Sequence, residues 1–143
     1  MFNQSLFELT NPQKSIWSLE QFYKNTSVNN IGGTLIIKEK IDFDFLEKSI
    51  NLFIKGNDSF NIQLQFDKDN SIKQFFSDYT YHKIDLINLN SYDDLLIKEK
   101  ELVDNSFSLL NAPLFRFTMF KFPDNSGGII MIIHHLISDA FSC

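Results

Sequence analysis

Residues 128–139 of the chain read Gly-Ile-Ile-Met-Ile-Ile-His-His-Leu-Ile-Ser-Asp. The first six residues are a continuous apolar run that begins at a glycine, which predicts a β-strand buried on both faces. Two histidines and an aspartate follow in the pattern His-His-x-x-x-Asp. Successive side chains of a strand point to opposite faces, so we expect one imidazole in a cleft and the other in the wall behind it.

The motif is compatible with three kinds of site. Imidazole is the side chain best suited to exchange a proton near neutral pH, which favours a catalytic site. The alternative is a pair of ordinary polar residues, with His134 and His135 satisfied by backbone carbonyl oxygens at a strand end. A metal site needs three or four ligands. Because His134 and His135 diverge and His82 is distant in the sequence, we expect no metal.

Three further segments accompany the motif in a defined order. They are Leu-Thr-Asn-Pro-Gln-Lys-Ser-Ile-Trp-Ser-Leu-Glu-Gln at 9–21, Asn-Ile-Gly-Gly at 30–33 and Ala-Pro-Leu-Phe-Arg at 112–116. With His134-His135-x-x-x-Asp139 and the Ala-Phe-Ser that follows, they resemble the condensation domains of nonribosomal peptide synthetases. These domains form part of the chloramphenicol acetyltransferase-like superfamily, and the resemblance extends from about residue 9 to residue 142.

The mixture of hairpin and helix patterns predicts an α/β (α+β) two-layer sandwich, with a largely antiparallel mixed sheet and helices on one side. The resemblance implies the first lobe of a chloramphenicol acetyltransferase-like fold. We therefore expect residues 1–143 to form the N-terminal lobe of a condensation domain, truncated just after the motif. A C-terminal lobe would be missing, and the substrate tunnel would lie between the two lobes.

The resemblance also implies a reaction. An acyl or peptidyl thioester on one carrier protein domain is attacked by the amine of an aminoacyl group on another, and both groups are held on phosphopantetheine arms. His135 would face the tunnel and either take a proton from the amine or orient it and stabilise the tetrahedral intermediate. His134 would be mainly structural, and Asp139 would fix the loop. No cofactor would bind directly, and the isolated chain is expected to be inactive.

Two other functions stay open. One is a non-catalytic truncated lobe that docks a carrier protein or another partner chain, and the other is a stand-alone acyltransferase that uses coenzyme A. Two departures from the family pattern favour a degenerate or specialised member. Asn61 stands where relatives have an arginine that pairs with the motif aspartate, and Ala140 stands where they have glycine. A neutral amide cannot supply the charge of a guanidinium.

Composition and charge exclude several kinds of partner and site. The net charge is −5 and basic residues form no stripe, so we expect no nucleic-acid partner. No apolar stretch approaches 18 residues, so we expect no membrane span. Cys143 is the single cysteine, which excludes an intramolecular disulfide and a Cys-x-x-Cys zinc site. With no signal-peptide pattern at residues 1–5, the expected location is the cytoplasm.

Local patterns place the secondary structure. We expect a helix capped by Asn11 that presents Ile16, Leu19 and Phe22 on one face, and a second helix capped by Asp42 and closed by Gly56. A third helix should run from Ser91 to about Phe107. Strands or extended pieces are expected at 32–38, 60–66, 72–76, 80–84, 114–122 and 128–133. A turn at Asp67-Lys68-Asp69-Asn70 should join the second and third of these as a hairpin.

Three single residues receive modest roles. Trp17 is expected in the core or between lobes, Arg116 in a surface or interlobe salt bridge, and His82 on an exposed strand.

Overall fold

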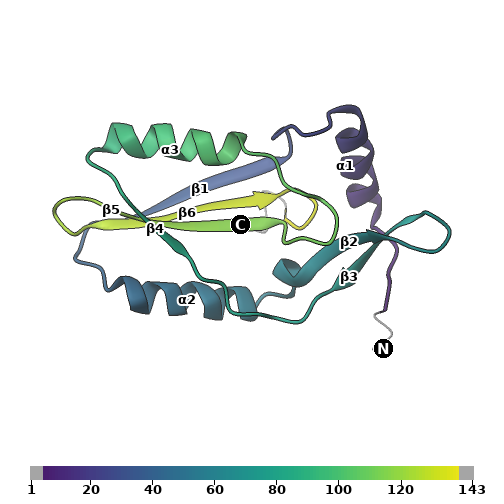
Figure 1. Ribbon diagram of the computed structural model, residues 1–143, viewed down its shortest axis with the longest axis horizontal. Helices are drawn as coiled ribbons and strands as arrows, with labels where there is room; N and C mark the ends of the chain where they lie inside the picture. The colour runs from purple at the N-terminus through teal and green to yellow at the C-terminus, as the bar shows by residue number, and fades with distance from the viewer. Residues whose placement is uncertain (1–4, 139–143) are drawn as a thin grey trace.

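The computed structural model describes residues 5–138 of the 143-residue chain. Its elements, in chain order, are α1 (Asn11–Phe22), β1 (Asn30–Ile37), α2 (Phe43–Lys55), the 3-10 helix η1 (Asp58–Asn61), β2 (Ile62–Phe66), β3 (Ile72–Phe76), β4 (Asp85–Asn88), α3 (Tyr92–Asp104), β5 (Phe115–Lys121) and β6 (Gly127–His134) (Figure 1). The apolar run identified in the sequence is thus the last described strand, and the motif begins at its end.

The main sheet places β6 in its interior, in the order β1-β6-β5-β4. β6 pairs antiparallel with β1 and with β5, while β4 runs parallel to β5. β2 and β3 form a separate antiparallel pair, as the turn at 67–70 predicted. The mixed, largely antiparallel α/β fold is therefore confirmed. Because β6 is paired on both edges, its register, and with it the position of the motif, is fixed twice.

Helices cover both faces of the main sheet, not one as we expected: α3 lies on one face and α2 on the other (Figure 1). The alternation of β6 explains the difference. Ile130 and Ile132 pack in the cluster that contains Leu95 of α3, whereas Ile133 packs with Ile50 and Ile54 of α2. A strand that is apolar on both faces needs cover on both.

The first helix differs from its prediction at its start and in the face it buries. Its N-cap is Thr10 instead of Asn11: the N–H of Gln13 donates to Thr10 Oγ1, and the N–H of Thr10 donates to Gln13 Oε1 at 2.8 Å. Phe22 is 84% exposed, while Gln13 and Glu20 are buried. These two residues are seven positions apart and share a helix face. The inward face of α1 is therefore partly polar.

The other two helices begin where the sequence predicts. Asp42 caps α2 by accepting from the N–H of Phe45 at 3.0 Å, and Ser91 caps α3 by accepting from the N–H of Asp94 at 3.1 Å. Gly56 is the C-cap of α2, as expected, and adopts an ordinary right-handed helical conformation. α3 ends at Asp104, earlier than expected.

Residues 79–84 are extended but are not a strand. Their hydrogen bonds go to side chains of α2: Asn51 Oδ1 accepts from the N–H of His82 at 2.7 Å and from the hydroxyl of Tyr79 at 3.0 Å. The carbonyl of His82 accepts from Asn51 Nδ2 at 2.8 Å. His82 is half-buried, with its ring 5.1 Å from that of Phe115, and not exposed on a strand as expected.

Glu47 of α2 makes the stability of this attachment depend on pH. Its buried carboxylate accepts from the N–H of Ile84, the ammonium of Lys83 and the hydroxyl of Tyr81. These bonds, the one from Ile84 foremost, hold the pKa of Glu47 below its ordinary value. A lowered folded-state pKa gives stability that is present above the unfolded-state pKa and is lost as the pH falls through the folded-state value.

We therefore expect Glu47→Gln to lower the melting temperature at neutral pH and to flatten its fall below about pH 4. Thermal unfolding followed by circular dichroism at a series of pH values measures this. Glu39→Gln, at an exposed glutamate, is the matched control and should follow the unsubstituted chain. Equal pH profiles for both variants would contradict a role for Glu47.

Candidate active site

The first histidine of the motif is buried. His134 is the last residue of β6, is 2% exposed, and donates its backbone N–H to the carbonyl of Leu114 at 2.9 Å. Its Nδ1 accepts the N–H of Leu136 at 3.1 Å, and its Nε2 lies 3.1 Å from Glu20 Oε1. Because an amide N–H can only donate, the ring proton of the neutral imidazole is on Nε2 and points at the carboxylate.

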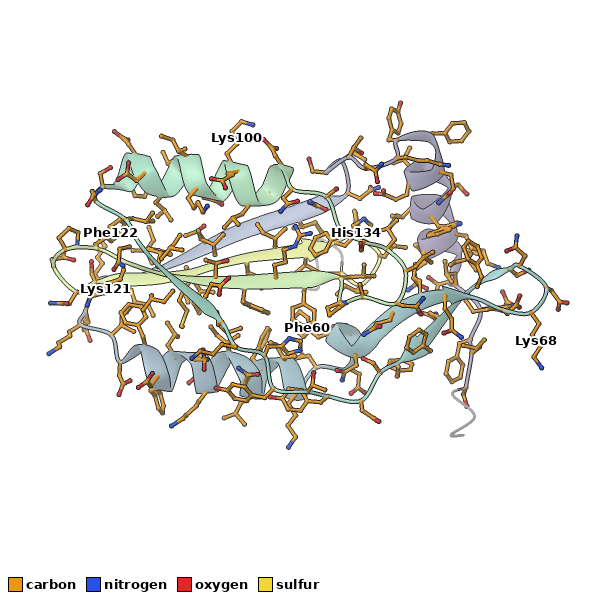
Figure 2. All side chains as sticks on the ribbon, viewed as in Figure 1. Phe60, Lys68, Lys100, Lys121, Phe122 and His134 are labelled. Carbon is orange, nitrogen blue, oxygen red and sulfur yellow. The ribbon has the colours of Figure 1, made fainter. Side chains whose placement is uncertain are left out.

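The pKa of His134 is lowered, chiefly because burial disfavours the charged ring; Glu20 opposes this shift. The ring is therefore neutral near pH 7, and its two nitrogens are both engaged by protein groups. Figure 2 shows His134 at the end of the sheet that lies toward α1.

The second histidine is exposed and has a defined tautomer. The backbone N–H of His135 donates to the carbonyl of Asn29 at 2.8 Å, and its Nδ1 lies 2.8 Å from the carbonyl oxygen of Ser138. A carbonyl oxygen can only accept, so Nδ1 carries a proton, and in the neutral ring Nε2 carries the lone pair. The two neighbouring imidazoles thus lie in different environments, as strand alternation predicts. His135 can accept a proton at Nε2 without breaking its bond to Ser138.

A buried carboxylate that the sequence analysis did not single out lies behind the motif. Glu20 is 5% exposed, and its Oε1 accepts from Asn29 Nδ2 at 2.6 Å in addition to facing His134. The only sequence signal was a glutamate on the same helix face as Gln13, where an apolar residue would be usual. Without a partner, such a carboxylate would be costly to bury.

Gln13 joins α1 to the turn at residues 135–137 within the motif, which is called the motif turn from here on. Its Nε2 donates to the carbonyl of Leu136 at 3.1 Å and to Gln74 Oε1 at 2.9 Å. The glutamine that precedes Ile16 and Trp17 in the opening segment therefore holds β3 and the motif turn together. Trp17 itself is partly buried against the main core, as predicted, with its ring 6.1 Å from that of Phe66.

Arg116 contacts Phe107, which packs against the ring of His134. Its guanidinium donates to the carbonyls of Asn105 at 2.7 Å and Ser106 at 2.5 Å, and it lies 3.9 Å from the ring centre of Phe107. Phe107 in turn packs edge-on against His134 at 5.9 Å. The salt bridge expected for Arg116 is thus replaced by carbonyl and cation–π contacts.

Two hollows lie on either side of Ile137 and Ser138, at the end of the motif turn. One, of about 270 Å³, is lined by His135 together with Thr10, Pro12 and Ile16 near the start of α1. The other, of about 400 Å³, is lined by residues of α2, η1 and β6 and by Asn57, which precedes η1; the residues from these elements are Phe53, Ser59, Phe60, Met131 and Ile133. Both include Ile137 and Ser138, so the motif turn forms a wall between them.

Asp139 and Ala140 lie outside the described residues, so the roles expected for them stay predictions. Asn61 ends η1 and lines a third hollow with His82 and Phe115, whereas Asn57 and Ser59 line the hollow that Ser138 borders. Within residues 5–138, no group of three or more His, Cys, Asp or Glu side chains is placed to hold a metal ion. No helix in that range is long and apolar enough to cross a membrane.

Comparison with known proteins identifies the family. The family model described as "Condensation domain" matches residues 3–143. The chain belongs to the condensation domain family. Among curated relatives, surfactin synthase subunit 1 of Bacillus subtilis (strain 168) is 30% identical over 146 residues, and bacitracin synthase 3 of Bacillus licheniformis is 25% identical over 138 residues. These alignments cover 96% and 95% of this chain but 4% and 2% of the relatives, so the chain spans a small part of each.

Solved condensation domains have the same fold. A variant of the starter condensation domain of the rhizomide synthetase RzmA superposes with a TM-score of 0.85 at 18% identity, over 96% of this chain and 34% of that one. The first condensation domain of the CDA synthetase gives 0.80 at 15% identity, over 92% and 36%. This condensation-family chain therefore corresponds to about a third of a solved condensation domain.

Proposed function

We propose that this chain is the N-terminal lobe of a condensation domain and supplies His135 to amide-bond formation between carrier-bound substrates. The observation that carries the proposal is the tautomer of His135, whose Nδ1–H is held by Ser138 and whose Nε2 lone pair is left for a substrate proton. The family relationship supports the reaction class, and the coverage of about a third of solved domains supports the assignment as one lobe.

In this proposal the chemistry is acyl transfer from sulfur to nitrogen. The acceptor amine forms a C–N bond to the thioester carbonyl, the C–S bond breaks, and the amine loses one proton while the phosphopantetheine thiolate gains one. His135 Nε2 either takes the proton or accepts a hydrogen bond that orients the amine and stabilises the tetrahedral intermediate. His134 stays neutral and holds the turn. Asp139 is proposed to fix the loop beyond Ser138.

The partners in this proposal are two carrier protein domains, which bring donor and acceptor on phosphopantetheine arms, and a C-terminal lobe that completes the tunnel. Positioning two substrates in one site can supply roughly 7–11 kcal/mol of barrier reduction. The lobe described here contributes the imidazole, and no cofactor of its own is proposed.

A second kind of acyl donor, coenzyme A, is supported by one structurally similar protein and by one groove of this chain. A variant of the RzmA starter domain was solved in complex with C8-CoA and superposes on this chain with a TM-score of 0.79. In this chain an apolar groove of about 420 Å³ lies between α2 and the sheet, lined in part by Leu35, Ile50, Phe53 and Met131. An acyl group delivered by coenzyme A is therefore the alternative donor, in an acyltransferase that uses no donor carrier.

The test is a single-turnover assay of the full-length gene product. An aminoacyl-loaded acceptor carrier is mixed with either an acyl-loaded donor carrier or an acyl-coenzyme A, and the amide product is measured by mass spectrometry. Amide from the carrier donor supports the proposal, and amide from coenzyme A alone supports the second candidate. Carrier binding without any amide product would contradict both and favour a docking lobe.

A further inference from the structure

A closed polar network lies directly behind the exposed imidazole. Glu20 Oε1 collects two hydrogen bonds, one from Asn29 Nδ2 at 2.6 Å and one from His134 Nε2 at 3.1 Å. The three residues are 5%, 7% and 2% exposed, so the network is shielded from solvent. A broken hydrogen bond at that depth leaves a buried polar group unsatisfied, which is costly. A fully bonded network of this kind therefore holds its members rigidly in place.

The same network reaches the backbone on both sides of the His135 side chain. Asn29, held through its side chain, accepts the His135 N–H with its carbonyl at 2.8 Å. His134, held through Nε2, accepts the Leu136 N–H with Nδ1 at 3.1 Å. Two consecutive peptide N–H groups, those of residues 135 and 136, are therefore fixed by groups that Glu20 orients.

We infer that Glu20 is a positioning residue for His135, acting through Asn29 and His134. Glu20 lies on α1, which also holds the carbonyl of Leu136 through Gln13, so one rigid helix fixes the motif turn at both ends. A displacement of the order of 1 Å at a catalytic group can cost about 10²-fold in rate. The inference rests on the proposed function in one respect only, namely that the positioned imidazole serves amide formation.

Because Glu20 Oε1 accepts both hydrogen bonds, two substitutions of Glu20 can test whether that acceptor oxygen is needed. Glu20→Gln keeps an oxygen at the position of Oε1, so it can still accept from both Asn29 and His134. Glu20→Ala removes the acceptor. Glu101→Ala is the matched control, because Glu101 lies exposed on α3 and pairs with Lys98 on the surface. If Glu20→Ala does not fold, Asn29→Ala replaces it: that variant keeps the carbonyl that binds His135 and deletes the link to Glu20.

On the chain itself, nitrogen-15 NMR of the imidazoles measures the tautomer of His135. Amide hydrogen exchange measures how firmly the backbone N–H groups of residues 135 and 136 are held. We expect Glu20→Ala, or Asn29→Ala, to lower the Nδ1–H fraction of His135 and to raise exchange at residues 135 and 136 at least tenfold. Glu20→Gln and Glu101→Ala should leave both unchanged. A folded alanine variant with the native His135 tautomer and native exchange would overturn the inference.

In the full-length gene product, Glu20→Ala should lower kcat for amide formation roughly 10- to 100-fold while KM stays within about twofold, and Glu20→Gln should recover most of the loss. A loss that merely follows the folded fraction, with no recovery in the glutamine variant, would overturn the positioning role. If the unsubstituted protein forms no amide but the His135 tautomer responds to Glu20 as expected, the proposed function fails and the link between Glu20 and His135 stands.

Discussion

Replacing His135 by alanine in the full-length gene product is expected to lower amide formation by about 10²–10⁴-fold while leaving the fold almost unchanged. The side chain is exposed, and its one described hydrogen bond, from Nδ1 to the carbonyl of Ser138, joins it to its own turn. The bond to Asn29 is made by the backbone and survives the substitution. Single-turnover rates and melting temperatures, measured on the same preparations, check both halves of the expectation.

The neighbouring substitution is the control with the opposite signature. His134→Ala removes a ring that is 2% exposed, takes one donor from Glu20, and leaves the N–H of Leu136 without its acceptor. We expect a loss of stability of about 3 kcal/mol or more, and the protein that still folds should lose no more than the roughly 10- to 100-fold in kcat expected of Glu20→Ala, because the ring belongs to the same network. If His134→Ala abolishes turnover in a stable protein and His135→Ala unfolds it, the roles of the two imidazoles are reversed.

The features that could be predicted from the sequence are those set by neighbouring residues. The apolar run of β6, the cap at Asp42 and the turn at 67–70 each depend on a few adjacent side chains, and each is where it was expected. The motif histidines follow from the same strand, because alternation alone separates a buried imidazole from an exposed one. Local chemistry therefore predicted both the class of fold and the place of the candidate site.

The parts that were missed depend on contacts between distant residues. Glu20 and His134 are 114 positions apart, and Gln13 and Leu136 are 123 apart. The inward face of α1 was mispredicted for the same reason. Apolar residues are used as markers of burial, yet a glutamine and a glutamate with partners elsewhere in the chain can be buried while Phe22 is exposed.

The extended segment at 79–84 shows a second limit. Its sequence predicted an extended piece, but its hydrogen-bond partners are Glu47 and Asn51 on a helix. Periodicity reports which side chains are buried and not which groups satisfy the backbone, so a strand and a side-chain-anchored segment look alike in the sequence.

A large stability effect of a small substitution is expected at Gly128. A Cβ there would overlap the backbone carbonyl oxygen of Leu35 in β1 and lie 3.0 Å from the ring of Phe120 in β5. Backbone in a paired strand cannot move aside as a side chain can, so β1 would have to separate from β6. We expect Gly128→Ala to destabilise the chain by about 3 kcal/mol, a large share of the roughly 5–15 kcal/mol that holds a domain folded.

Gly33→Ala is the matched control, on a neighbouring strand of the same sheet. Apart from Gly33 itself and its two neighbours in the chain, no atom of the described residues lies within 4 Å of the position that its Cβ would take. Alanine there should be neutral or stabilising by up to about 1 kcal/mol, because it restricts the unfolded chain more than glycine does. Urea unfolding followed by circular dichroism compares the two. Equal tolerance would mean that β1 does not pair with β6 in the register described, and the anchor of His135 on Asn29, which immediately precedes β1, would lose its support.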